Sequence, residues 1–530
     1  MSPAAYIYRS AGNYLDPLLP GPNVPLGGGA TGLVARPDLP FDMPTRGTLA
    51  ASPRKVWAHW MGGAYSMSID NKDPGTDTTE YWRRLWQPPG GLEGTTDHSA
   101  YGGLVRQRKK YTPRVAGGTP SYQVRDRITE IGWARDAGFD GYTAEMLQVP
   151  QTGTIPLTAS SQPQRWGQLL ELLDAADAVA DPTFTVTLMP DASTSGSSNA
   201  TTLAAAIHAV AARRVTMIAG QLLIAPYGPE LAPANTATNA LQFWTDVQTA
   251  LRGYGHNPIF WFCYTHAWRV APQAPTLDPI AYGHGRWGTR NPVESGGTDA
   301  DNGGAGAYCH TNFGKPWMAP VSVGDERPNQ NKFNERRNTE QLRVSWTSAI
   351  NAGVKADWVQ VPTWDDFAEG AMIGPTQESG FFWLDVSAYY LVRYKTGAWP
   401  TILRDAIYLS HRKQFVSGAT LTGGQTQFQV ITGATPAVDQ VEALIFTTAP
   451  NGTAVVTVGG VDTPFNLAAM TPVSPGVYSC TVPLAVGAVS ATLARNGAQI
   501  AAVASPTAVV SSLVSQDMSY YGCTSLTGHI

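Results

Sequence analysis

The pattern that most limits the fold of this chain is a regular alternation of apolar and helical segments between residues 53 and about 412. The apolar segments that predict strands are 55–61, 141–146, 184–189, 217–224, 258–264, 317–323 and 358–363. Helical patterns lie between them at 122–137, 164–180, 201–212, 236–253 and 338–351. Strands that alternate with helices predict parallel βα units. A strand count near eight, without a dinucleotide-binding fingerprint, favours an α/β fold of the closed (β/α)8, TIM-like barrel type.

The regions on either side of this pattern have different compositions. Residues 1–52 are rich in Pro and Gly and predict an extended arm that wraps on the barrel or on another protein. Residues 413–530 contain few charges and many short apolar runs separated by turn signals, which is typical of a β-sandwich. We therefore expect an arm (1–52), a barrel (53–412) and a sandwich (413–530) that either binds carbohydrate or supports the barrel. Long loops predicted at 64–120 and 268–316 would crown the C-terminal face of the barrel.

The composition restricts the partners of the protein. Only 14% of the residues are charged and the net charge is -4, so nothing indicates nucleic-acid binding or membrane insertion. The N-terminus does not resemble a signal peptide. Cys263, Cys309, Cys480 and Cys523 form no Cys-x-x-Cys pair, and both disulfides and free buried thiols remain open alternatives. The histidines lack metal-ligand spacing and no Gly-x-Ser-x-Gly motif occurs, so we expect no metal and no other cofactor.

A short acidic loop follows the last predicted strand. Residues 364–370 read WDDFAEG, with Asp366 and Glu369 three positions apart beside two aromatic residues. Glycoside hydrolysis needs two carboxyl groups: one donates a proton to the leaving oxygen, and the other activates water or attacks the sugar directly. The alternative is a solvated acidic turn or a cap of the following helix.

Several segments, in the same order along the chain, resemble glycoside hydrolase family 71, the α-1,3-glucanases or mutanases. The similar segments are 56–63 (VWAHWMGG), 137–142 (AGFDGY), 317–322 (WMAPVS), 364–369 (WDDFAE), 389–390 (YY), 394–397 (YKTG), 482–484 (VPL) and 494–497 (ARNG). The chain departs from the family pattern in its longer loop after the first strand, in Asp365 where the family has Asn, and in the missing secretion signal.

The resemblance implies hydrolysis of a polysaccharide with inversion, in which one of Asp366 and Glu369 protonates the glycosidic oxygen and the other deprotonates water. We favour Glu369 as the acid and Asp366 as the base. Nearby negative charges, including Asp365, should raise one of the two pKa values and keep that group protonated near neutral pH. Inversion needs carboxyl groups about 6.5–9.5 Å apart and retention about 5–5.5 Å, and a spacing of three in a loop permits either. The predicted substrate-binding residues are His59, Trp60, Asp191, Glu230, Trp268, Asp325 and Trp364, with Trp261 as a further stacking candidate and Glu326 as an alternative to Asp325.

Each of these residues has a structural alternative, such as a turn carboxylate, a core histidine or a core tryptophan. Two other functions are also compatible with the sequence. The barrel could bind glycan without cleaving it. The chain could also be a minor tail protein of a bacteriophage that binds or degrades host surface glycan. Such a protein would act outside the cell without a signal peptide, and its N-terminal arm would join it to a virion or a homo-oligomer.

Overall fold

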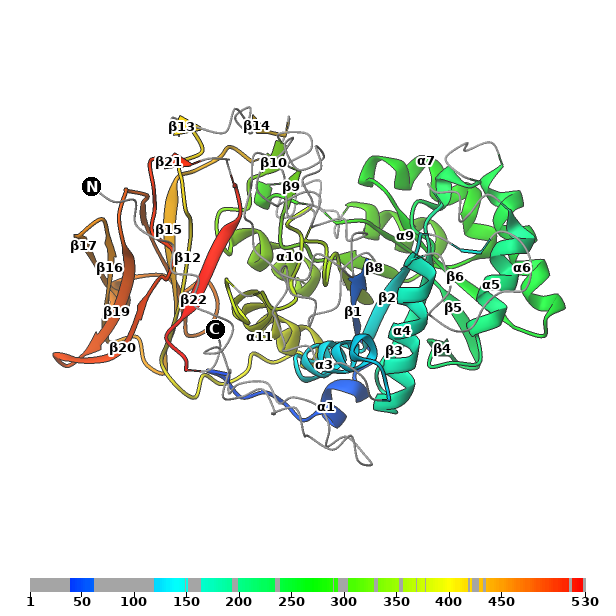
Figure 1. The fold of residues 1–530 in the computed structure, drawn as a ribbon, viewed down its shortest axis with the longest axis horizontal. Coiled ribbons are helices and arrows are strands. Elements are labelled where there is room, and N and C mark those ends of the chain that lie inside the picture. Colours follow the sequence, from blue (N-terminus) through cyan, green and yellow to red (C-terminus); the bar gives the residue numbers. More distant parts are fainter. Residues whose placement is uncertain are drawn as a thin grey trace.

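The computed structural model describes residues 39–61, 119–147, 149–150, 164–192, 199–233, 239–288, 290–293, 304–327, 332–351, 356–367, 369–376, 378–417, 420–421, 429–431, 435–513 and 517–527. Most of the predicted arm and of the predicted loop at 64–120 therefore lie outside the described residues. Within the described ranges, no helix combines the length and the apolar character needed to cross a membrane. Figure 1 shows a barrel with its helices on one side of the molecule and stacked β-sheets on the other.

Eight parallel strands form a closed ring. They are β1 (Lys55–Trp60), β2 (Gly141–Met146), β3 (Thr185–Pro190), β5 (Gln221–Ile224), β6 (Pro258–Tyr264), β7 (Ala281–Arg286), β8 (Trp317–Pro320) and β11 (Trp358–Val361). Each pairs with the next in this order, and β11 pairs with β1 to close the ring. The surrounding helices are α3 (Tyr122–Asp136), α4 (Gln164–Val179), α5 (Ala200–Val210), α6 (Ala240–Gly253), α7 (Ala267–Leu277), α9 (Gly306–Phe313), α10 (Glu340–Ile350) and α11 (Phe382–Thr396). The predicted (β/α)8 barrel is confirmed.

Two details of the predicted barrel are wrong. The single strand predicted at 217–224 is a hairpin of β4 (Met217–Ile218) and β5. The segment 268–316, predicted as a loop, contains most of α7 together with β7 and α9. Strand β7 escapes prediction because Gly283 and Gly285 occupy its inward positions. A Cβ atom at Gly283 would lie 3.0 Å from the ring of Trp261, so this strand must lack side chains where a neighbouring tryptophan fills the barrel.

The barrel interior is arranged in layers, because alternate residues of each strand point inwards. The lowest layer is an apolar cluster that includes Trp57, Trp261 and Trp358, and the rings of Trp261 and Trp358 stack 4.0 Å apart. The middle layer is polar: Gln360 Nε2 donates a hydrogen bond to Thr143 Oγ1 over 2.7 Å. The residues two positions further along each strand form the upper layer at the barrel mouth.

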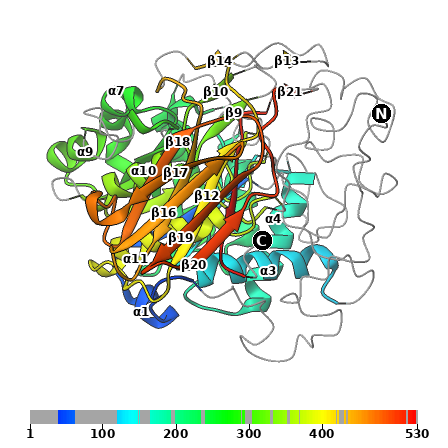
Figure 2. The same ribbon diagram turned by 90° about the vertical axis from the view of Figure 1, so that its left-hand side faces the viewer.

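Two antiparallel four-stranded sheets follow the barrel (Figure 2). The first has the order β18 (Val477–Pro483), β15 (Gln440–Phe446), β12 (Ala406–Arg412) and β22 (Tyr520–Thr524), and the second has the order β17 (Val461–Asn466), β16 (Gly452–Val458), β19 (Val489–Arg495) and β20 (Ala498–Ala504). Alternate apolar residues of the two sheets share one buried cluster. The predicted boundary after residue 412 is too late, because β12 already pairs with β15 and β22.

The remaining elements are short. They are α1 (Arg46–Ala51), η5 (Pro229–Leu231), η6 (Asp278–Ile280), β9 (Asp325–Arg327), β10 (Lys332–Asn334), β13 (Thr420–Leu421), β14 (Gln429–Val430), η9 (Leu467–Ala469) and β21 (Ser512–Leu513). Strands β9, β10 and β14 form a small separate sheet. All four cysteines are buried and free, so neither of the possible disulfides is present.

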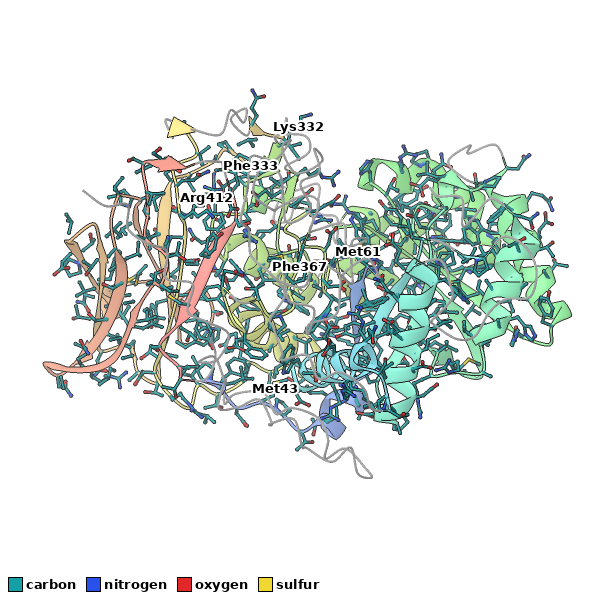
Figure 3. All side chains as sticks on the ribbon, in the orientation of Figure 1. Met43, Met61, Lys332, Phe333, Phe367 and Arg412 are labelled. Carbon is teal, nitrogen blue, oxygen red and sulfur yellow. The ribbon has the colours of Figure 1, made fainter. Side chains whose placement is uncertain are left out.

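The barrel and the C-terminal sheets are joined through buried charges and aromatic rings. Arg412 of β12 forms an ion pair with Glu335 at 2.5 Å, and its guanidinium lies over the rings of Phe333 and Tyr520. Figure 3 shows Phe333 and Arg412 between the two parts of the molecule. At the described end of the predicted arm, the buried Phe41 packs 5.2 Å from the ring of Tyr389 in α11. The sheets are therefore packed on the barrel and are not attached by a linker alone.

Substitution of Gly283 tests the close packing of β7. Gly283→Val should lower the free energy of unfolding by about 1–3 kcal/mol, because the added side chain collides with the ring of Trp261 and with a backbone carbonyl. Gly253→Ala at the end of α6 is the control, since a Cβ atom there has no neighbour within 4 Å. The melting temperature should fall clearly for Gly283→Val only; equal melting temperatures would contradict this packing.

Candidate active site

The loop after β11 is held in one conformation by its own hydrogen bonds. The Asp366 amide donates to Thr363 Oγ1 over 2.8 Å, and the Glu369 amide donates to Asp366 Oδ1 over 2.9 Å. Gly370 has a positive φ of 60°, which allows the chain to turn back. The Ala371 amide then donates to the carbonyl of Asp366 over 3.1 Å. These bonds place the predicted catalytic carboxylates next to each other at the barrel mouth.

Asp365 faces away from this pair. Its Oδ1 accepts a hydrogen bond from the Met61 amide over 2.8 Å, and its side chain is buried. The charge of Asp365 contributes to the electrostatics of Arg127 and Tyr142, which lie on the helix side of the barrel. The negative charges that raise the pKa of Glu369 most are therefore those of Asp366 and Asp325, and not that of Asp365 as expected.

Glu369 lies among charges of both signs. Its Oε2 is 3.3 Å from Arg327 Nη2 and 4.0 Å from Arg290 Nη2. Loss of hydration raises the pKa of Glu369 to about 7, helped by the negative charges of Asp366 and Asp325, while the two arginines oppose the shift. Because 34% of its side chain remains exposed, a ligand can still reach it. A carboxyl group with these properties can donate a proton near neutral pH.

The upper layer of the barrel brings further polar and aromatic side chains to the mouth. Asp191, directly after β3, pairs through its backbone with Tyr227, which follows β5. The Tyr227 ring packs at 4.9 Å against Trp287, which follows β7. Burial raises the pKa of Tyr227, and so do the nearby charges of Asp191, Glu369 and Glu145. Asp191 and Glu369 therefore both lie within electrostatic range of Tyr227. Glu145, Tyr227 and Trp287 are further residues at the mouth that the sequence patterns did not single out.

His59 also points into the barrel, below this layer. Its Nδ1 lies 3.3 Å from Thr143 Oγ1, and its ring meets Trp287 edge-on at 4.7 Å. Burial, together with the positive charge of Arg290, lowers the pKa of His59 to about 3, so the ring is neutral. The Nε2 atom is buried and forms no hydrogen bond with any described residue. Thr143 Oγ1 accepts from Gln360 and can also donate its hydroxyl hydrogen to His59 Nδ1, in which case Nε2 carries the N–H hydrogen.

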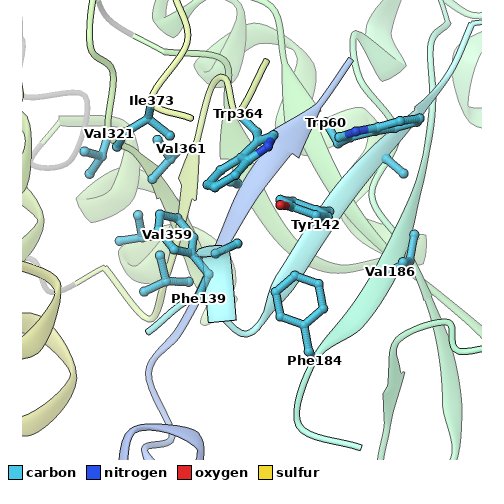
Figure 4. Packing of buried hydrophobic residues seen from close by; sticks show 14 of the residues in the cluster. Trp60, Phe139, Tyr142, Phe184, Val186, Val321, Val359, Val361, Trp364 and Ile373 are labelled. Atoms are coloured by element: carbon cyan, nitrogen blue, oxygen red, sulfur yellow. The ribbon is translucent and has the colours of Figure 1, made fainter. Parts of the chain in front are cut away.

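Three predicted stacking residues belong to the core instead. Trp60 and Trp364 are almost completely buried and lie on the outer side of the strands, among the apolar residues shown in Figure 4. Trp60 follows His59 directly in β1, so the two side chains must point to opposite faces. The Trp364 indole donates to Glu130 over 3.3 Å. Trp261 fills the lowest layer of the barrel, and none of these three rings offers a face to a sugar.

The other predicted binding residues have mixed outcomes. Glu230 is buried, and its Oε1 accepts from both the amide and the hydroxyl of Thr265, at 3.1 and 2.7 Å. Its carboxylate therefore stabilises a turn and does not line the mouth.

Asp325 in β9 accepts from Arg327 Nε at 3.1 Å and acts electrostatically on Glu369. Glu326 points the other way, towards Ser519. Trp268 lies in α7, and its side chain is outside what the structure describes.

Among the described residues, the half-buried Trp287 is an aromatic residue at the mouth, where it contacts His59 and Tyr227 and has Arg290 5.9 Å above its ring. The sequence patterns do not indicate Trp287 and Arg290, because both follow the unpredicted strand β7. Among the described residues, no group of three or more His, Cys, Asp or Glu side chains is arranged to hold a metal ion.

Comparison with known proteins identifies the family. The family model described as glycosyl hydrolase family 71 matches residues 236–524, more than half of the chain, including Asp366 and Glu369. The chain belongs to glycosyl hydrolase family 71. The resemblance inferred from the sequence motifs is thus confirmed, and the protein is a glycoside hydrolase with a closed (β/α)8 barrel.

Solved structures provide more distant likenesses. An endo-α-mannosidase of family 99 from Bacteroides thetaiotaomicron is 12% identical, with a TM-score of 0.42 over 64% of this chain and 97% of its own. A glycoside hydrolase-like protein is 11% identical, with a TM-score of 0.41 over 69% of this chain and 99% of its own. No curated protein gives a significant sequence match.

The stability of a Glu369→Gln variant should depend on pH. The raised pKa means that the folded protein keeps a proton on Glu369 that the unfolded chain loses between about pH 4.5 and 7. Glu369 therefore lowers the free energy of unfolding progressively as the pH rises from about 4.5 to 7, and the loss remains above pH 7. Glu369→Gln should raise the melting temperature more at pH 8 than at pH 5.

The control for this measurement is Asp246→Asn, which removes an exposed carboxylate on α6. Its melting temperature relative to the parent should be the same at both pH values. A Glu369→Gln variant that behaves in the same way would contradict the raised pKa.

Proposed function

We propose that this glycoside hydrolase cleaves an α-glucan at α-1,3 linkages by an inverting mechanism, with Glu369 as general acid and Asp366 as general base. The observation that supports this most directly is the position of Glu369 at the barrel mouth. Its pKa is about 7 and its amide is hydrogen-bonded to the carboxylate of Asp366. The α-1,3 linkage is carried over from the resemblance to the glucanases of the family.

Glu369 suits the acid role because it can carry a proton at neutral pH and remains accessible. When a glycosidic oxygen accepts this proton, Glu369 becomes negative, and Arg327 and Arg290 are close enough to stabilise that charge. The same two arginines keep the pKa from rising further. The acid can therefore be reprotonated between turnovers near neutral pH.

Asp366 suits the base role because its carboxylate is stabilised as an anion. Its Oδ1 accepts the Glu369 amide, and Arg327 lies within electrostatic range. An anionic carboxylate can accept a proton from water as the water attacks the anomeric carbon on the face opposite the leaving group. Inversion then follows if a water molecule fits between Asp366 and the sugar.

The remaining groups at the mouth would bind the sugar. Trp287 can stack on a sugar ring, and the buried Nε2 of His59 can form a hydrogen bond with a hydroxyl group. Glu145, Asp191 and Asp325 offer carboxylate oxygens that accept from hydroxyl groups. These acceptors outnumber the two arginines, which favours an uncharged glycan over an anionic one.

The proposed pair can be tested with isosteric variants. Asp366→Asn and Glu369→Gln should each lower kcat by about 10²–10⁴-fold on any glucan that the parent cleaves, because each removes one proton-transfer step. The parent rate should fall as the pH rises above about 7, as Glu369 loses its proton. Release of reducing ends from α-1,3- and α-1,4-glucans measures activity and linkage, and proton NMR of the first product measures inversion.

Asp365→Asn is the matched control, since Asp365 adjoins the pair in sequence but faces Met61. It should keep most of the parent activity. Full activity in either Asp366→Asn or Glu369→Gln would contradict the assignment, and a parent that binds but never cleaves glycans would support the non-catalytic alternative. Association with a bacteriophage tail stays a prediction, which co-purification of the chain with virions would test.

The role of Trp287 in binding can be separated from catalysis. Trp287→Ala should raise KM by roughly five- to tenfold with a smaller change in kcat, because a stacking contact is worth about 1 kcal/mol. Trp287→Phe should recover most of the affinity. An unchanged KM in Trp287→Ala would show that the sugar does not contact this ring.

A further inference from the structure

We propose that the C-terminal sheets are part of the catalytic apparatus, because Glu326 ties strand β9 to them and so positions Asp325 and Arg327 against Glu369. This inference rests on the proposed role of Glu369 and adds a positioning residue, Glu326, that touches neither of the proposed catalytic carboxylates with its side chain. It also assigns a function to the C-terminal sheets, for which the sequence leaves binding and support as alternatives.

Strand β9 has two functional faces. Side chains alternate along a strand, so Asp325 and Arg327 share one face and Glu326 occupies the other. On the first face, Arg327 binds Asp325 at 3.1 Å and Glu369 at 3.3 Å. The backbone also takes part, because the amide of Glu326 donates to the carbonyl of Glu369 over 2.6 Å. The position of β9 therefore determines which charges surround Glu369.

On the second face, Glu326 reaches the segment before β22. Its Oε1 accepts the Met518 amide over 2.6 Å, and its Oε2 accepts the Ser519 hydroxyl over 2.8 Å. This segment is itself fixed, since Asp517 accepts from Tyr521 over 2.6 Å and pairs with Lys413 at 2.9 Å. Glu326 is 5% exposed, so its two bonds to the C-terminal segment are protected from water.

The small sheet of β9, β10 and β14 by itself gives β9 little support. Strand β9 has three residues and pairs only with β10 among the described strands. Three-residue strands give few hydrogen bonds, so the two bonds that Glu326 makes on the second face contribute strongly to holding β9 in place. Loss of this anchor would let Asp325 and Arg327 move away from Glu369 and let water reach it.

The charged and titratable groups around Glu369 and Glu326 come from several elements. Those that face Glu369 are Asp366 from its own loop, Asp325 and Arg327 from β9, Arg290 from the segment after β7 and Tyr227 from the segment after β5. Arg336 lies near Glu326. Removal of the anchor would hydrate Glu369 and weaken the effect of Asp325, and both changes lower its pKa. The simultaneous loss of the Arg327 charge would raise this pKa, but Arg327 contributes less than hydration or Asp325, so the net change is a lower pKa.

The test compares Glu326→Ala with Glu326→Gln in the full chain. The glutamine side chain can accept from the Met518 amide and donate to Ser519 Oγ, so it keeps both bonds without the charge. Hydrogen exchange of peptides covering 325–327 and 363–371 should be at least about tenfold faster in Glu326→Ala and close to the parent in Glu326→Gln. Glu326→Ala should also lower kcat by about 10- to 100-fold with little change in KM, and shift the upper limb of the pH–rate profile to lower pH.

Glu442→Ala provides the matched control. Glu442 is an equally buried carboxylate that links the sheets to the barrel, but it binds Thr339 and Arg343 at the start of α10 instead of β9. Its removal should lower the melting temperature without faster exchange in β9 and without a shift of the pH–rate profile. Equal effects of Glu326→Ala and Glu442→Ala, or parent behaviour of Glu326→Ala, would overturn the proposal.

If Glu326→Ala does not fold, Ser519→Ala removes one of the two bonds, and faster exchange in β9 supports the proposal while parent exchange overturns it. If the parent cleaves no glycan, the proposed function fails, but the exchange measurements still decide whether Glu326 anchors β9.

Discussion

Closure of eight parallel strands into a ring is the constraint on which this structure depends. It sends every second side chain of each strand into one shared interior, so residues far apart in sequence occupy common layers. Tryptophans fill the lowest layer, a hydrogen-bonded polar layer lies above it, and Asp191, Tyr227 and Trp287 reach the mouth. Asp366 and Glu369 complete the mouth from the loop after β11. The chemistry of the protein is therefore confined to one end of the barrel by the geometry of its strands.

Gathering several carboxylates in one place opposes folding, and the structure offsets this cost with fixed partners. Arg327 bridges Asp325 and Glu369, Asp366 accepts a backbone amide, and Asp365 accepts another on the opposite side of the loop. The pKa of Glu369 is still raised, chiefly by loss of hydration and further by the charges of Asp366 and Asp325. Sites that tune pKa values in this way commonly sacrifice stability for activity. The sheets that pack against β9 and α10 supply apolar burial and ion pairs that help the barrel to tolerate such a site.

The periodicity of the chain was sufficient to predict the barrel, seven of its strand regions and the loop that carries Asp366 and Glu369. Strand β7 could not be found by an apolar pattern, because its inward positions are glycines that accommodate Trp261. Trp287 and Arg290 were missed with it. Alternation along β2 could have indicated Glu145, and alternation along β1 could have separated His59 from Trp60. Glu230 could not be distinguished from a subsite residue by sequence, since its partner Thr265 lies 35 positions away.

A crystal structure of the Glu369→Gln variant with a bound oligosaccharide would test the central claim most directly. We expect a glycosidic oxygen within hydrogen-bonding distance of the side chain at position 369. We also expect a water molecule between Asp366 and the opposite face of the same sugar, with a sugar ring against Trp287. An oligosaccharide whose linkages all lie away from both side chains would contradict the account.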